Sequence, residues 1–142
     1  MTKSLPRHVR SAPLKTEQLS SKVLVVDDQF TVRELQRSIL EAAGYRVETA
    51  SDGREALNRL AADPQISLMV TDIEMPKMGG IELLRSLRSK RNSSSLPIVV
   101  VSSRGDEEDR RLGAEAGADA YIAKDEFNQQ ALLDTVQRLI TA

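Results

Sequence analysis

The sequence contains no cysteine, so disulfide bonds and thiol chemistry are excluded. Histidine occurs once, as His8, which disfavours a buried histidine base or a histidine-ligated metal. Aromatic residues make up only 3% of the chain, too few for a base-stacking surface for single-stranded nucleic acid. No apolar run approaches the roughly 18 residues of a membrane span, and no apolar secretory signal opens the chain.

An excess of charge of one sign is also missing, because the formal net charge is −1 over 142 residues. Apolar residues make up 40% and charged residues 29%, a composition typical of a globular domain with a single core. We therefore expect one cytoplasmic domain that binds neither nucleic acid directly nor a membrane.

The first 21 residues differ from the rest in composition. They contain two prolines and no apolar periodicity, and Glu17 is the one acid beside four basic side chains. This pattern predicts a flexible leader or linker in residues 1–21 and a folded domain in 22–142. A basic arm for an anionic partner is the less favoured alternative.

Short apolar runs alternate with stretches of helical spacing from Lys22 onward. The expected strands are Val23–Val26, Arg46–Ala50, Leu68–Thr71, Ile98–Val101 and Ala120–Ala123. The expected helices are Phe30–Ala43, a segment around Ala56–Ala61 that stops near Pro64, Ile81–Leu87, Asp106–Ala116 and Phe127–Ile140. Five such pairs predict an α/β fold with a doubly wound, five-stranded parallel sheet and helices on both faces.

The strand order 2-1-3-4-5 is one of the two common arrangements of such a sheet, and its first and third strands are neighbours. Their carboxyl ends would bring Asp27, Asp28 and Asp72 together. At about 4 Å and an effective dielectric constant of about 20, one carboxylate pair costs about 4 kcal/mol. A hard cation relieves this repulsion, and few carboxylates with room for water favour Mg²⁺.

Asp72 has a second possible use, because a carboxylate can attack phosphorus and form an aspartyl phosphate. Ser102 follows the fourth strand and offers a hydroxyl donor, and Lys124 follows the fifth and adds a positive charge. The stretch around Asp72, taken alone, also allows a plain helix cap. No glycine-rich phosphate-binding loop follows the first strand.

Four pieces of sequence carry a family resemblance. They are Asp27–Asp28, the run VTDIEMPKMGG that ends at Gly80, the Val101-Ser102-Ser103 triplet, and Lys124. In this order, residues 22–142 resemble the receiver domains of two-component response regulators, which have the flavodoxin-like fold. The sequence after Lys124 is most similar to the receivers of chemotaxis-type hybrid histidine kinases.

The resemblance implies that Asp72 is the phosphoacceptor and that a histidine kinase is the phosphodonor. It implies that Mg²⁺ is held by Asp28, Asp72 and the backbone carbonyl of Glu74, with Asp27 acting chiefly through water. The protein would then be a switch rather than an enzyme, with only slow self-catalysed phosphoryl transfer and dephosphorylation.

The resemblance also implies that Ser102 and Lys124 bind the phosphoryl group. It implies that the Tyr121 side chain changes its rotamer when the protein switches. Plain packing is the alternative for Tyr121. A downstream signalling protein would bind the surface of Asp106–Ala116, the fifth strand and the last helix. The thin apolar face of Asp106–Ala116 suits a moving element. Self-association into a dimer is left open.

One position departs from the receiver pattern, because Lys124 is followed by Asp125 where most receivers have proline after a cis bond. A non-proline cis bond costs about 3–4 kcal/mol, so we expect a trans bond or a strained cis bond. Two other functions stay open. One is a receiver-like interaction module that is never phosphorylated. The other is an aspartate-nucleophile phosphatase, disfavoured because Glu74 stands where a second aspartate is usual.

Overall fold

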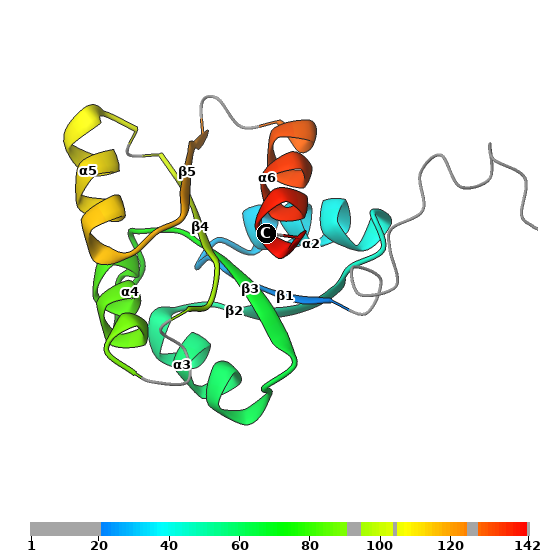
Figure 1. Ribbon diagram of the computed structural model, residues 1–142, viewed down its shortest axis with the longest axis horizontal. Coiled ribbons are helices and arrows are strands. Elements are labelled where there is room, and N and C mark those ends of the chain that lie inside the picture. Colours follow the sequence, from blue (N-terminus) through cyan, green and yellow to red (C-terminus); the bar gives the residue numbers. More distant parts are fainter. Residues whose placement is uncertain (1–20, 91–94, 104, 125–127, 142) are drawn as a thin grey trace, which may run out of the picture.

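A five-stranded parallel sheet forms the centre of the protein, and helices cover both of its faces (Figure 1). The computed structural model describes residues 21–90, 95–103, 105–124 and 128–141. The strands lie in the predicted order β2-β1-β3-β4-β5. They are β1 Lys22–Val26, β2 Arg46–Ala50, β3 Ile66–Thr71, β4 Ile98–Ser102 and β5 Ala120–Ala123. The helices are α2 Phe30–Ala42, α3 Gly53–Ala62, α4 Gly80–Arg88, α5 Glu107–Ala116 and α6 Gln129–Thr141.

The central strands are buried on both faces, which explains their continuous apolar sequences. Successive residues of β1 contribute to different cores, because strand side chains alternate between the two faces. Val23 and Val25 pack in the core beneath α2 and α6. Leu24 and Val26 pack in the core beneath α3, α4 and α5. Figure 1 shows these two groups of helices on opposite sides of the sheet.

Side-chain caps fix the starts of three helices and correct one predicted boundary. The carboxylate of Asp52 accepts a hydrogen bond from the Glu55 amide, so α3 begins at Gly53 and contains the predicted segment Ala56–Ala61. Asp106 caps α5 in the same way. The Asn128 side chain accepts from the Ala131 amide, so the predicted start of the last helix at Phe127 is wrong by two residues.

Two predictions fall on residues outside the described ranges. Residues 1–20 of the predicted leader are among them, so the boundary at residue 21 stays a prediction. Asp125 is another, so the geometry of the Lys124–Asp125 bond also stays a prediction. Among the residues that the structure describes, no helix has the length and apolar content needed to cross a membrane.

Candidate functional site

The pairing of β1 with β3 determines the position of the acidic residues that follow each strand. Val26 is the register partner of Thr71, so Asp27 and Asp72 leave the sheet side by side. The Asp72 amide donates to the Val26 carbonyl at 3.0 Å, and the Asp27 amide donates to the Ala50 carbonyl at 3.1 Å. Backbone hydrogen bonds therefore hold both aspartates at the carboxyl edge of the sheet, where ligand sites of open α/β folds lie.

Asp27, Asp28 and Asp72 form an acidic cluster at this edge. Each side chain offers a carboxylate oxygen, and the three oxygens lie within 4.8 Å of one another. Asp27 and Asp72 are buried, whereas Asp28 is exposed. The donor set fits Mg²⁺, because this ion prefers a few carboxylate oxygens and keeps several waters, which the exposed side admits. The structure therefore brings together the three aspartates that the sequence grouped.

Lys124 lies against the acidic cluster. Its Nζ atom is 3.5 Å from Asp27 Oδ2 and 3.7 Å from Asp72 Oδ2. Although the proline usual after this lysine is missing, the ammonium group points toward the carboxylates. The Asp27 side chain is 1% exposed, so this positive charge offsets a carboxylate that has almost no contact with water.

The carboxylate of Asp72 is held by the backbone that follows it. Its Oδ1 atom accepts a hydrogen bond from the Ile73 amide at 2.7 Å, while Oδ2 faces Lys124. Burial raises the pKa of Asp72 above its ordinary value of 3.8. Lys124 lowers this pKa, Asp27 raises it, and the amides of Ile73 and Glu74 lower it, but burial has the largest effect.

The raised pKa of Asp72 predicts a stability effect in metal-free solution. The native state binds this proton more tightly than the unfolded state, so stability falls as pH rises from 3.8 through the native pKa. With EDTA at pH 7, Asp72→Asn is expected to raise the free energy of unfolding, by less than the roughly 4 kcal/mol of one close carboxylate pair. Urea unfolding at pH 7 and at pH 3 measures this gain, which should shrink at the lower pH. An equal gain at both pH values would contradict the assignment.

Ser102 ends β4 at the same edge of the sheet and is completely buried. Its register partner on β5 is Ala123, the residue before Lys124. Neighbouring strands therefore place Ser102 and Lys124 next to each other along this edge. The phosphoryl-binding role of Ser102 stays a prediction.

Tyr121 lies on β5 and packs toward α5. Its ring carbons come to 3.0 Å from the point where a Cβ atom at Gly113 would lie, so the missing side chain of Gly113 admits the ring. The Arg110 guanidinium carbon is 5.3 Å from the ring centroid, and this guanidinium also donates to the Tyr121 carbonyl. The ring is packed between α5 and the sheet, and its role as a switch stays a prediction.

The segment after β3 shows that Asp72 is not a helix cap. Helix α4 begins at Gly80, and its N-cap residue is Gly79. The Gly80 amide donates to the Ile73 carbonyl at 2.7 Å, which turns the chain tightly beside the acidic cluster. The alternative that Asp72 only caps the next helix is therefore wrong. The role of the Glu74 carbonyl as a metal ligand stays a prediction.

Arg33 was not identified from the sequence, yet it holds the loop that carries the acidic cluster. Its guanidinium donates to the Asp27 carbonyl at 2.8 Å and lies 5.5 Å from the Phe30 ring centroid. The Gln29 amide donates to Asp27 Oδ1 at 2.9 Å within the same loop. The sequence feature that could have identified Arg33 is its position five residues after Asp28. This spacing alone does not show what the guanidinium binds.

Arg33→Met is expected to lower the affinity for Mg²⁺ by roughly tenfold, the scale seen when groups that orient metal ligands are removed. Calorimetric titration with Mg²⁺ measures the effect. Arg37→Met is the matched control, because Arg37 lies on the same helix and pairs only with Glu34 and Glu41 among the described residues. Equal affinities of both variants and the unchanged chain would contradict a positioning role for Arg33.

Comparison with known proteins identifies similar sequences and folds. A family model described as "Response regulator receiver domain" matches residues 23–137. The chain is 37% identical over 118 residues to a gliding motility regulatory protein of Myxococcus xanthus, covering 83% of this chain and 15% of that protein. It is 38% identical over 120 residues to the transcriptional regulatory protein CpxR homolog of Haemophilus influenzae, covering 84% of this chain and 50% of that protein. The chain thus spans half or less of the length of these relatives.

Among solved structures, the chemotaxis response regulator CheY4 of Vibrio cholerae has a similar fold. It superimposes with a TM-score of 0.77 at 35% identity, covering 84% of this chain and 98% of that one.

Proposed function

Because the chain belongs to the family of response regulator receiver domains, we propose that it is a phosphoacceptor switch in a two-component phosphorelay. Asp72 receives the phosphoryl group from a histidine kinase. One observation carries this proposal: Asp72 Oδ2 lies 3.7 Å from Lys124 Nζ within a group of three carboxylates. Such a site combines a nucleophile, a cation-binding set and a fixed positive charge.

The proposed step transfers a phosphoryl group between two side chains. Asp72 Oδ2 attacks phosphorus and forms a P–O bond, while the P–N bond to the kinase histidine breaks. The electron pair of that bond stays on the histidine nitrogen, which takes up a proton. We assign this attack to Oδ2, which faces Lys124, because Oδ1 already accepts the Ile73 amide. In-line geometry and electrostatic stabilisation then supply most of the catalysis.

Asp28 and Asp72 would hold Mg²⁺, with the Glu74 carbonyl as a further ligand and Asp27 acting through water. When bound, the ion would supply positive charge that neutralises developing charge on the phosphoryl oxygens. Lys124 would compensate part of the same charge, since it already lies 3.5 Å from Asp27 and 3.7 Å from Asp72. Ser102 contributes a hydroxyl donor from the buried end of β4.

We propose that the signal leaves through the surface of α5, β5 and α6, which a downstream protein binds. Asp109, Gly113 and Ala116 are the buried residues of α5, so little apolar side-chain area anchors this helix. Elements with few buried contacts are the ones that rearrange most easily. The phosphoryl group would change the conformation of this element. It would not be an intermediate in the turnover of a substrate.

Intact mass measured after incubation with acetyl phosphate tests the proposal. With Mg²⁺ we expect one phosphoryl increment per chain, and with EDTA we expect none. An equal increment in EDTA would contradict the role of the metal. If neither acetyl phosphate nor a panel of phosphorylated histidine kinases gives an increment, the chain is an unphosphorylated interaction module. Rapid turnover of a small phosphate ester would instead favour the aspartate-nucleophile phosphatase.

A further inference from the structure

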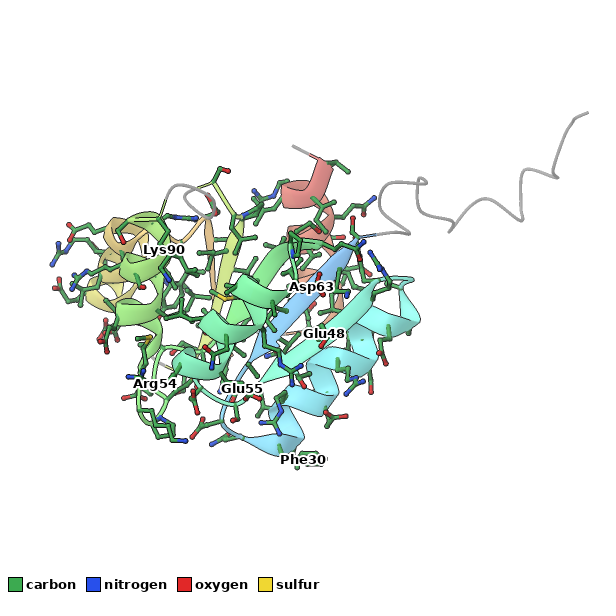
Figure 2. The ribbon with its side chains drawn as sticks, turned by 90° about the horizontal axis from the view of Figure 1, so that it is seen from below. Phe30, Glu48, Arg54, Glu55, Asp63 and Lys90 are labelled. Carbon is green, nitrogen blue, oxygen red and sulfur yellow. The ribbon has the colours of Figure 1, made fainter. Side chains whose placement is uncertain are left out.

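A groove lies between α3 and α4 at the edge of the sheet opposite the acidic cluster. Its volume is about 330 Å³, within the usual range of ligand pockets. Leu57 and Leu60 of α3, Leu87 of α4, Ile66 and Leu96 give it an apolar lining, and Asp63 and Lys90 are its charged members. Figure 2 labels Asp63 and Lys90, and Phe30, which begins α2 after the acidic cluster, lies below them at the bottom of the view.

The described chain enters the fold beside this groove. Lys22 is the first residue of β1, and its register partner on β3 is Ile66, which lines the groove. Paired strands lie only about 4.8 Å apart. The Lys22 Nζ atom also binds Asp63 Oδ2 at 2.6 Å. Residues 1–20 therefore join the fold directly at one end of an apolar groove.

The sequence before Lys22 has the side chains that the groove would accept. Leu19 and Leu14 precede Lys22 by three and eight residues. At about 3.5 Å per extended residue they reach up to about 10 and 28 Å from it. Glu17 is the one acidic residue before Lys22, and Lys90 forms no ion pair with any of the residues that the structure describes. The apolar and charged groups of the two segments thus match in kind.

We propose that residues 14–19 bind in the α3–α4 groove of the same chain, with Leu14 and Leu19 against its apolar lining and Glu17 near Lys90. Attachment at Lys22 favours this occupant over any free partner, because a short tether gives an effective concentration in the millimolar range. Even a weak contact is therefore populated within one chain. The groove is remote from the acidic cluster, so this proposal does not depend on phosphorylation.

A spin label tests the proposal cleanly because the chain has no cysteine. A nitroxide on Thr16→Cys broadens the amide signals of nearby residues in a ¹⁵N-labelled chain. We expect several-fold stronger broadening at Leu60 and Lys90 than at Gly44. Gly44 is the matched reference. It lies two residues from Arg46, whose amide donates a hydrogen bond to the Ser21 carbonyl, so it is also close to the point where the chain enters the fold, but on the side away from the groove.

Two comparisons decide the outcome. Adding Leu14→Ser and Leu19→Ser to the labelled chain should remove the difference between Lys90 and Gly44, while the tether stays the same. Broadening that is equal at Lys90 and Gly44 before this change would overturn the proposal. A mixture of spin-labelled ¹⁴N chain and unlabelled ¹⁵N chain should show no broadening at the groove. Broadening there would mean that a second copy is the occupant, which also overturns it.

Discussion

Asp72→Asn is expected to abolish phosphoryl uptake from acetyl phosphate or a phosphorylated kinase. The amide keeps the shape of the side chain and an oxygen for the Ile73 amide, but it is neither charged nor a nucleophile toward phosphorus. Among the described residues, Asp72 alone has a carboxylate with both the Ile73 amide and Lys124 as partners, so we expect complete loss rather than a slower reaction. Intact mass after incubation with Mg²⁺ and donor measures the result.

Asp134→Asn is the control for this loss. Asp134 is exposed on α6, where it accepts a hydrogen bond from Gln130 far from the acidic cluster. This variant should take up one phosphoryl group like the unchanged chain. A full phosphoryl increment in Asp72→Asn would mean that another residue is the acceptor.

Gly80→Ala is expected to destabilise the fold by about 3 kcal/mol, at the upper end of overpacking effects. A Cβ atom at Gly80 would lie 2.3 Å from the Asp72 carbonyl oxygen and 2.7 Å from Ile73 Cα. Both are backbone atoms of the loop that leaves β3, so no side-chain rotation can relieve the clash. The loop must shift, and the Asp72 carboxylate shifts with it. Urea unfolding measures the loss of stability.

Gly79→Ala gives a matched comparison at the neighbouring position. A Cβ atom at Gly79 would lie 3.1 Å from the Ile73 carbonyl oxygen. Apart from the atoms of its chain neighbours, no other heavy atom of the described residues would lie within 4 Å, so a small adjustment accommodates it. We expect a cost of about 1 kcal/mol, mostly from the poorer N-cap. Equal losses in the two variants would mean that close approach to Asp72 does not explain the requirement at Gly80.

The fold was predictable because short strand-like segments and stretches of helical spacing alternate from Lys22 onward. The strand order then followed from the common doubly wound arrangement, and the order placed Asp27, Asp28 and Asp72 together. These features depend on periodicity and on strand ends, which one sequence shows directly. Helix starts were less accurate, because a cap such as Asn128 competes with neighbouring residues that look equally helical.

Contacts between residues distant in the chain were not predictable in this way. The Arg33 guanidinium bonds a backbone carbonyl, which has no sequence signature. The packing of Tyr121 depends on the missing side chain of Gly113, and neither residue alone predicts it. The tight approach of Gly80 to Asp72 likewise follows from the path of the loop. Such contacts decide how firmly the site is held, although not which residues compose it.

Chemical trapping of the phosphorylated residue tests the central claim most directly. Borohydride reduces an aspartyl phosphate to homoserine, and peptide mass spectrometry then locates the changed residue. After incubation with Mg²⁺ and acetyl phosphate, we predict homoserine at position 72 and at no other aspartate. Homoserine at position 27 or 28, or a stable phosphate on a serine such as Ser102, would contradict the assignment of Asp72 as the phosphoacceptor.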